Sequence, residues 1–202
     1  MAQKKGFTLI ELIIVIALIA LLATTVILVI NPAKLFQEAR DSQRISDLGQ
    51  MNSAMSIFLA SANPVSTTYL SDAGVVDAPE TCSTKCWTHG SATGANCGAR
   101  YAIARVTTAN SSQVVTGGGW IPVNLTVGGA SAAIAAWPID PKGNANATSF
   151  YGYACDNSSK TWEFSAKMES VRYSGTSAES VENTDGGNNA NLFEVGTGVN
   201  AL

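Results

Sequence analysis

The chain has 202 residues, of which 13% are charged, and its formal net charge is −3. This charge content excludes a charge-rich disordered chain, and the slightly acidic balance excludes a basic nucleic-acid-binding domain. Hydrophobic residues make up 46% of the chain but are unevenly spread, and no charged residue occurs from Leu12 to Ile30. An apolar N-terminal segment before a body rich in Ser, Thr and Asn indicates an exported protein with a membrane anchor.

Residues 7–30 are expected to form a helix that is long enough to cross a membrane. At 1.5 Å per residue such a helix spans roughly 36 Å, and the hydrocarbon core of a bilayer is about 30 Å thick. Lys4 and Lys5 precede the helix and would keep its N-terminal end on the cytoplasmic side. The apolar run is longer than the about 7–15 residues of a cleaved signal peptide, so a plain signal anchor is the simplest interpretation.

Glu11 argues against a plain anchor because it lies inside the apolar run. A carboxylate within a membrane is costly, so such a residue usually has a partner. No basic residue lies within helical reach in the apolar stretch. Cleavage after Gly6 would create an α-ammonium group on Phe7, which would be a natural partner for this carboxylate.

Residues 5–11, Lys-Gly-Phe-Thr-Leu-Ile-Glu, precede an unbroken apolar segment and resemble the processing motif of the type IV pilin superfamily. This superfamily includes type IV pilins, the pseudopilins of type II secretion and the pilins of DNA-uptake filaments. The resemblance implies that a prepilin peptidase removes the leader, residues 1–6, by cutting after Gly6, and methylates Phe7. It also implies that Glu11 meets the N-terminal amine of a neighbouring subunit during filament assembly.

Residues 31–62 are expected to continue the helix beyond the membrane as an amphipathic segment. Asn31-Pro32 predicts a kink or local unwinding at the membrane exit. Asn63-Pro64 predicts the end of the helix. Apolar residues recur at helical spacing and predict a stripe that packs against a globular domain. The stripe comprises Ile45, Leu48, Met51, Met55, Phe58, Leu59 and Ala62, and the polar faces comprise Arg40, Asp41, Gln43, Arg44 and Asp47.

Residues 63–202 are expected to form an exported, β-rich globular domain. Alternating apolar residues predict strands at 101–106 and 120–127, the second after a tight turn at 117–119. Residues 150–155 and 161–169 flank turn-forming residues and predict a hairpin, in which Glu163 and Ser165 face away from Trp162 and Phe164. An antiparallel sheet packed on a long helix is an α+β fold, and it matches the pilin fold.

The four cysteines, Cys82, Cys86, Cys97 and Cys155, lie in the exported domain. Four cysteines in such a domain predict two disulfides, with three possible connectivities. A zinc site built from the first three cysteines is a weaker alternative, because the spacing is irregular. The chain has one histidine, His89, which is expected to be an exposed loop residue.

Two loops add to the resemblance. Residues 137–144 resemble a loop of major pseudopilins and small pilins. Residues 182–191 resemble the acidic, glycine-rich loop in which major pseudopilins bind calcium. This resemblance implies a calcium site with Glu182, Asp185 and Asn188 as ligands, since calcium prefers carboxylate and amide oxygens. A surface loop rich in turn formers is the other interpretation.

The sequence contains no nucleophile-elbow, phosphate-loop or paired-histidine motif, so we expect a structural protein and not an enzyme. The expected function is that of a filament subunit. A single-pass precursor in the cytoplasmic membrane would be processed and then assembled by the pilus machinery into a homo-oligomeric surface filament. Adhesion, motility or DNA uptake would be properties of that fibre, and no direct nucleic-acid site is expected. The alternatives are a major pseudopilin and a monomeric, membrane-anchored binding protein, which would have no use for Glu11.

Overall fold

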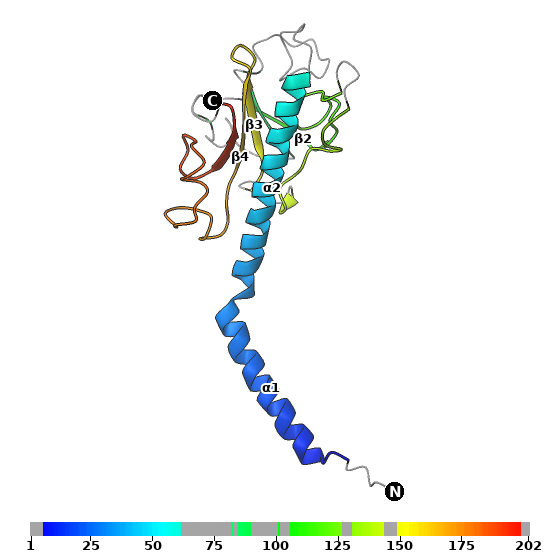
Figure 1. Cartoon of the computed structure of the whole chain (residues 1–202), viewed down its shortest axis with the longest axis vertical. Coiled ribbons are helices and arrows are strands. Elements are labelled where there is room, and N and C mark those ends of the chain that lie inside the picture. Colours follow the sequence, from blue (N-terminus) through cyan, green and yellow to red (C-terminus); the bar gives the residue numbers. More distant parts are fainter. Residues whose placement is uncertain are drawn as a thin grey trace. The chain divides into compact units, whose positions relative to one another are not determined.

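The computed structural model describes residues 6–61, 82, 85–89, 101, 106–126, 131–143 and 149–198 (Figure 1). The chain divides into two compact units, Met1–Gln37 and Glu38–Leu202. The helices are α1 (Leu9–Ile30) and α2 (Pro32–Ser61). The strands are β1 (Lys85–His89), β2 (Val106–Asn110), β3 (Gly152–Asp156), β4 (Thr161–Ala166) and β5 (Phe193–Gly196).

Helix α1 is apolar along its length, and the stretch Leu9–Ile27 is long and apolar enough to span a membrane, with none of it buried. The helix ends at Asn31, which adopts a left-handed conformation with φ of 44°. Pro32 then starts α2, a position where the missing N–H costs no helical hydrogen bond. The predicted helix break at Asn31-Pro32 is therefore confirmed. The predicted helix stop at Asn63-Pro64 lies outside the described residues.

A five-stranded sheet in the order β2-β1-β3-β4-β5 forms the body of the second unit. The strands β1, β3, β4 and β5 pair antiparallel with their neighbours, and β2 adds a parallel edge strand beside β1. The α+β, pilin-like fold expected from the sequence is confirmed, with the parallel strand as an unexpected addition.

The core lies between α2 and one face of this sheet (Figure 1). Leu48, Met51 and Met55 on α2 are fully buried, as are Tyr153 on β3 and Phe164 on β4. Burying each large apolar side chain contributes about 1.5–3 kcal/mol. The predicted apolar stripe of the helix is thus the packing face, although Ala62 lies outside the described residues.

The predicted hairpin is present as β3 and β4, joined by the turn at residues 157–160. Asp156 stabilises the turn by accepting a hydrogen bond from the Ser158 amide at 2.8 Å. Strand β4 ends at Ala166, earlier than expected. Register places Glu163 and Ser165 on the face opposite Phe164, as predicted, and both are fully buried because that face of the sheet is covered as well.

The expected strand at 120–127 is wrong, since the segment forms only an isolated bridge between Thr116 and Asn124. Its alternating apolar residues are nevertheless buried, and the Leu125 amide donates to the Val115 carbonyl at 2.9 Å. The segment therefore packs as an irregular loop that buries its side chains without joining the sheet. The bridge makes residues 117–123 a wide loop and not the expected tight turn at 117–119. Val127 lies outside the described residues.

One further expectation needs correction, and another falls mostly outside the described residues. Of the strand expected at 101–106, Tyr101 is in no strand, residues 102–105 lie outside the described residues, and Val106 begins β2. His89 is the last residue of β1 and only 8% exposed, not an exposed loop residue. Its Nε2 lies 3.1 Å from the Ser111 carbonyl oxygen, which provides the buried ring with a polar partner.

Candidate functional site

The predicted cleavage site, Gly6 and Phe7, precedes helix α1 in a segment without regular secondary structure. Phe7 is 91% exposed, and among the described residues no atom beyond the chain neighbours of Gly6 lies within 4 Å of the position that a Cβ on Gly6 would occupy. Exposed, non-helical backbone is the form of chain that peptidases cleave most readily. The Gly6–Phe7 peptide bond is therefore sterically open to a processing enzyme.

Thr8 and Glu11 form a capping box at the start of α1. Glu11 Oε2 accepts hydrogen bonds from the Thr8 amide and the Thr8 hydroxyl, both at 2.8 Å. The Glu11 amide in turn donates to the Thr8 hydroxyl oxygen at 3.3 Å. Within the part of the chain that the structure describes, Glu11 Oε1 has no donor, so one carboxylate oxygen remains available to a cation.

The sequence interpretation missed this capping box, although its signal is present in the chain. A Thr followed three residues later by Glu, just before an apolar run, is the usual signature of such a helix start. The box fixes where Glu11 lies relative to the helix end. Because cleavage after Gly6 leaves Thr8 as an internal residue, its amide and hydroxyl survive processing.

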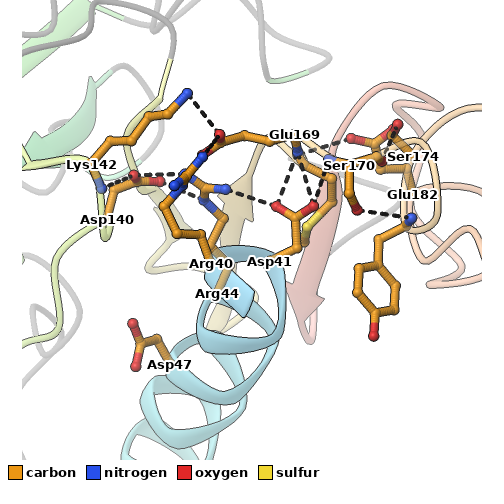
Figure 2. A network of polar contacts seen from close by, with 12 residues as sticks. Arg40, Asp41, Arg44, Asp47, Asp140, Lys142, Glu169, Ser170, Ser174 and Glu182 are labelled. Carbon is orange, nitrogen blue, oxygen red and sulfur yellow. Dashed lines mark hydrogen bonds and ion pairs between the residues drawn. The ribbon is translucent and has the colours of Figure 1, made fainter. Parts of the chain in front are cut away.

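A second group of polar residues surrounds Arg44 in the globular unit (Figure 2). Arg44 is fully buried, and its Nε and Nη2 donate to the two carboxylate oxygens of Asp140 at 2.7 and 2.8 Å. Its Nη1 donates to Asp41 at 2.7 Å, and Nη2 also donates to Glu169. Burial alone would lower the pKa of Arg44, but its carboxylate partners raise it. Arg44 thus stays charged and joins α2 to two segments distant in sequence.

Glu169 is the second centre of this network. Besides Arg44, it pairs with Arg40 and Lys142, each at 2.7 Å. Burial alone would raise the pKa of Glu169, but the hydrogen bonds from these three cations outweigh it and lower the pKa to about 2. The Glu169 amide also donates to Asp41 at 3.0 Å. Side chain and backbone together fasten the segment after β4 to helix α2.

The expectation that Asp41, Arg44 and Asp47 lie on polar outer faces of the helix is wrong, because all three are buried. Burial is tolerated because each charge has partners: Asp47, for example, accepts a hydrogen bond from the Tyr151 hydroxyl at 2.7 Å. Apart from the contacts Asp41–Arg44 and Gln43–Asp47 within the helix, the partner residues lie about a hundred positions or more away in the sequence, as for Arg44 and Asp140. Helical periodicity alone therefore could not reveal them.

The two carboxylates of the expected calcium site, Glu182 and Asp185, bond to backbone amides. Glu182 is buried and accepts hydrogen bonds from the amides of Met168 at 3.0 Å and Gly175 at 3.1 Å. Asp185 also accepts two backbone hydrogen bonds, and Asn188 is exposed. Burial raises the pKa of both carboxyl groups. Among the described residues, no three His, Cys, Asp or Glu side chains are grouped in a way that could hold a metal ion.

The structure joins Cys82 to Cys155 by a disulfide. Cys86 is disulfide-bonded as well, and Cys97 lies outside the described residues. The alternative of a zinc site that includes Cys82 and Cys86 is wrong, because a sulfur in a disulfide is not a thiolate ligand.

The α+β fold is pilin-like, and the apolar helix α1 has the length and composition of a membrane anchor. Residues 1–27 match the family model of the prokaryotic N-terminal methylation motif, which is the prepilin-processing signal of type IV pilins and pseudopilins. The resemblance expected from the sequence is therefore confirmed, and the motif implies processing by a prepilin peptidase and handling by an assembly machinery. No curated protein and no solved structure matches the chain.

Proposed function

We propose that this protein is the structural, non-enzymatic subunit of a type IV pilus-like filament that assembles through its N-terminal helices. The observation that carries the proposal is the order of three features along the chain. The Gly6–Phe7 cleavage site is followed directly by the exposed 22-residue apolar helix α1, and Glu11 lies in the first turn of that helix, where its carboxylate bonds to Thr8.

The apolar surface of α1 supports assembly through this helix. Large apolar side chains are exposed along the helix from Leu9 to Ile30. A helix that is hydrophobic on all sides must be covered by lipid or by other protein. Membrane lipid would cover α1 in the precursor, and the same helix from other copies would cover it in a filament.

Glu11 supports contacts between copies more specifically. Its Oε2 is held by Thr8, while Oε1 has no donor in the described residues. A charged oxygen in apolar surroundings favours a cation strongly. The mature N-terminal amine on Phe7, which processing creates, is a cation that every copy of the chain would carry.

A major pseudopilin is the second candidate. The loops at 137–144 and 182–191 favour it, because both resemble loops of that group. The two candidates share processing and helix packing, and they differ in the length and location of the assembly. Electron microscopy of material sheared from intact cells separates them, since a pilin forms long surface fibres and a periplasmic pseudopilin does not.

Two measurements on the cellular protein test the proposal. The intact mass of the mature subunit should correspond to loss of Met1–Gly6 and gain of one methyl group. Glu11→Ala should abolish the filament while leaving the chain in the membrane fraction. Thr24→Ala is the matched control, because it changes a side chain of the same helix that bonds only to the Ala20 carbonyl. A mature chain that retains Lys5, or a normal filament yield from Glu11→Ala, would contradict the proposal.

A further inference from the structure

Strand β5 is at the end of the sheet, and among the described strands it pairs only with β4. In an antiparallel pair, successive residues alternate between bonding to the partner strand and facing away from it. The Thr197 amide donates to the Trp162 carbonyl, so Val195 and Phe193 also face β4. The Glu194 amide therefore points to the outer side of the strand.

Such an outward amide is the group that another chain uses when it adds a strand to a sheet edge. In this protein it is occupied. The Glu194 amide donates to Asp185 Oδ2 at 2.6 Å, and Asp185 Oδ1 accepts a hydrogen bond from the Gly187 amide at 2.9 Å. The side chain of Asp185 thus takes the position of a neighbouring strand's carbonyl and is itself fixed by the following turn.

The side chain of Glu194 also bonds to this loop, so both its backbone and its side chain hold residues 185–189 against β5. Its Oε2 accepts a hydrogen bond from the Asn189 amide at 2.9 Å, and the residue is only 1% exposed. The Gly187 backbone lies so close that a Cβ there would collide with the Glu194 carboxylate and lie 3.0 Å from Glu194 Cβ. A side chain at position 187 would therefore displace the Glu194 carboxylate from its hydrogen bond to this loop.

We propose that residues 185–189 form an edge cap that prevents copies of this chain from pairing through β5. Self-association is then restricted to the N-terminal helices, so the inference rests on the proposed filament function. The partner that the cap excludes is a second copy of the chain, since β5 of one copy could otherwise pair with β5 of another. Such β5–β5 pairing would be favoured most where the subunit is concentrated, as in a membrane before assembly.

The test uses the full chain in detergent with Glu11→Ala in every variant, so that association through the helices does not contribute. Asp185→Ala removes the acceptor of the Glu194 amide. Asp156→Ala is the matched control. The Asp156 side chain also accepts a hydrogen bond from a backbone amide in a turn, but that turn joins β3 to β4 and lies away from β5. Gly187→Ala perturbs the loop by a second route, by displacing the Glu194 carboxylate. Near-ultraviolet circular dichroism shows which variants keep the native packing.

Hydrogen exchange of the 193–196 segment and light scattering are measured on each folded variant. We expect Asp185→Ala and Gly187→Ala to increase exchange of the Glu194 amide about tenfold at low protein concentration. We also expect both to form dimers or larger species as concentration rises, while the control stays monomeric. Unchanged exchange, or faster exchange in a chain that stays monomeric at every concentration, would overturn the inference. Failure of the filament proposal would appear separately, as an unprocessed N-terminus or as assembly without Glu11.

Discussion

Replacing Arg44 by methionine should destabilise the globular unit more than any other single charge removal in the Arg44 network. Methionine keeps an unbranched apolar stem and a similar helix propensity, but it removes every hydrogen-bond donor. Asp140 is only 4% exposed, and its carboxylate would lose two hydrogen bonds. Among the described residues it would keep one, from the Lys142 amide at 2.9 Å. Asp41 and Glu169 would each lose one of several partners.

The size of the effect follows from this arrangement. Removing one partner of a buried ion pair leaves a buried charge uncompensated and costs about 3–5 kcal/mol. We expect the upper half of that range, because Arg44 serves three carboxylates and has no exposed side-chain surface. Arg172→Met is the control: Arg172 pairs with Glu38 and Glu179 at the surface, where ion pairs contribute little.

Urea unfolding of the full chain in detergent, followed by tryptophan fluorescence, measures the effect. All four tryptophans are buried in the Glu38–Leu202 unit, so their emission reports on its unfolding. The double variant Arg44→Met/Asp140→Asn should recover part of the loss, because it also removes the carboxylate left without a cation. If Arg44→Met were no more harmful than Arg172→Met, the argument for a buried, charge-compensated network would be refuted.

The remaining predictions concern the pH dependence and the disulfide. The pKa of Glu169 is lowered to about 2 in the folded chain, so its contribution is present above pH of about 4.5 and lost as the pH falls toward 2. Urea unfolding should therefore show wild type more stable than Glu169→Gln by about 1–3 kcal/mol at pH 7, with the gap closing in acid; a constant gap would contradict this. Cys82→Ala/Cys155→Ala should lower the unfolding free energy by about 4 kcal/mol, since the bond joins residues 73 positions apart. Equal stability with and without a reductant would show that the bond does not form.

The features that the sequence predicted well all depend on neighbouring residues. The apolar length of α1 and the N-terminal methylation motif can be read within a single stretch of chain. The break at Asn31-Pro32 and the β3–β4 hairpin are equally local, because proline geometry and turn-forming residues act over a few positions. In each case the residues that determine the local structure belong to the same short segment of the chain.

The errors share a different cause, which is that a pattern of apolar residues reports burial and not the hydrogen-bond partner. Residues 120–126 bury their alternating apolar side chains as predicted, yet their backbone pairs with a loop and not with a strand. The sequence predicts an exposed loop position for His89, because nothing near it in sequence shows that β1 lies between β2 and β3.

The sequence by itself determined the character of the N-terminus: a prokaryotic N-terminal methylation motif that runs into an apolar helix with the length and composition of a membrane span. Only the tertiary structure decided which charged residues are buried and which partners compensate them. Asp41 and Arg44 resemble ordinary surface residues of a helix, since the cost of burying a charge favours solvent. The fold reverses that preference by bringing Asp140 and Glu169 to them from distant segments. Compensation between residues so far apart depends on how the whole chain packs, which no local pattern contains.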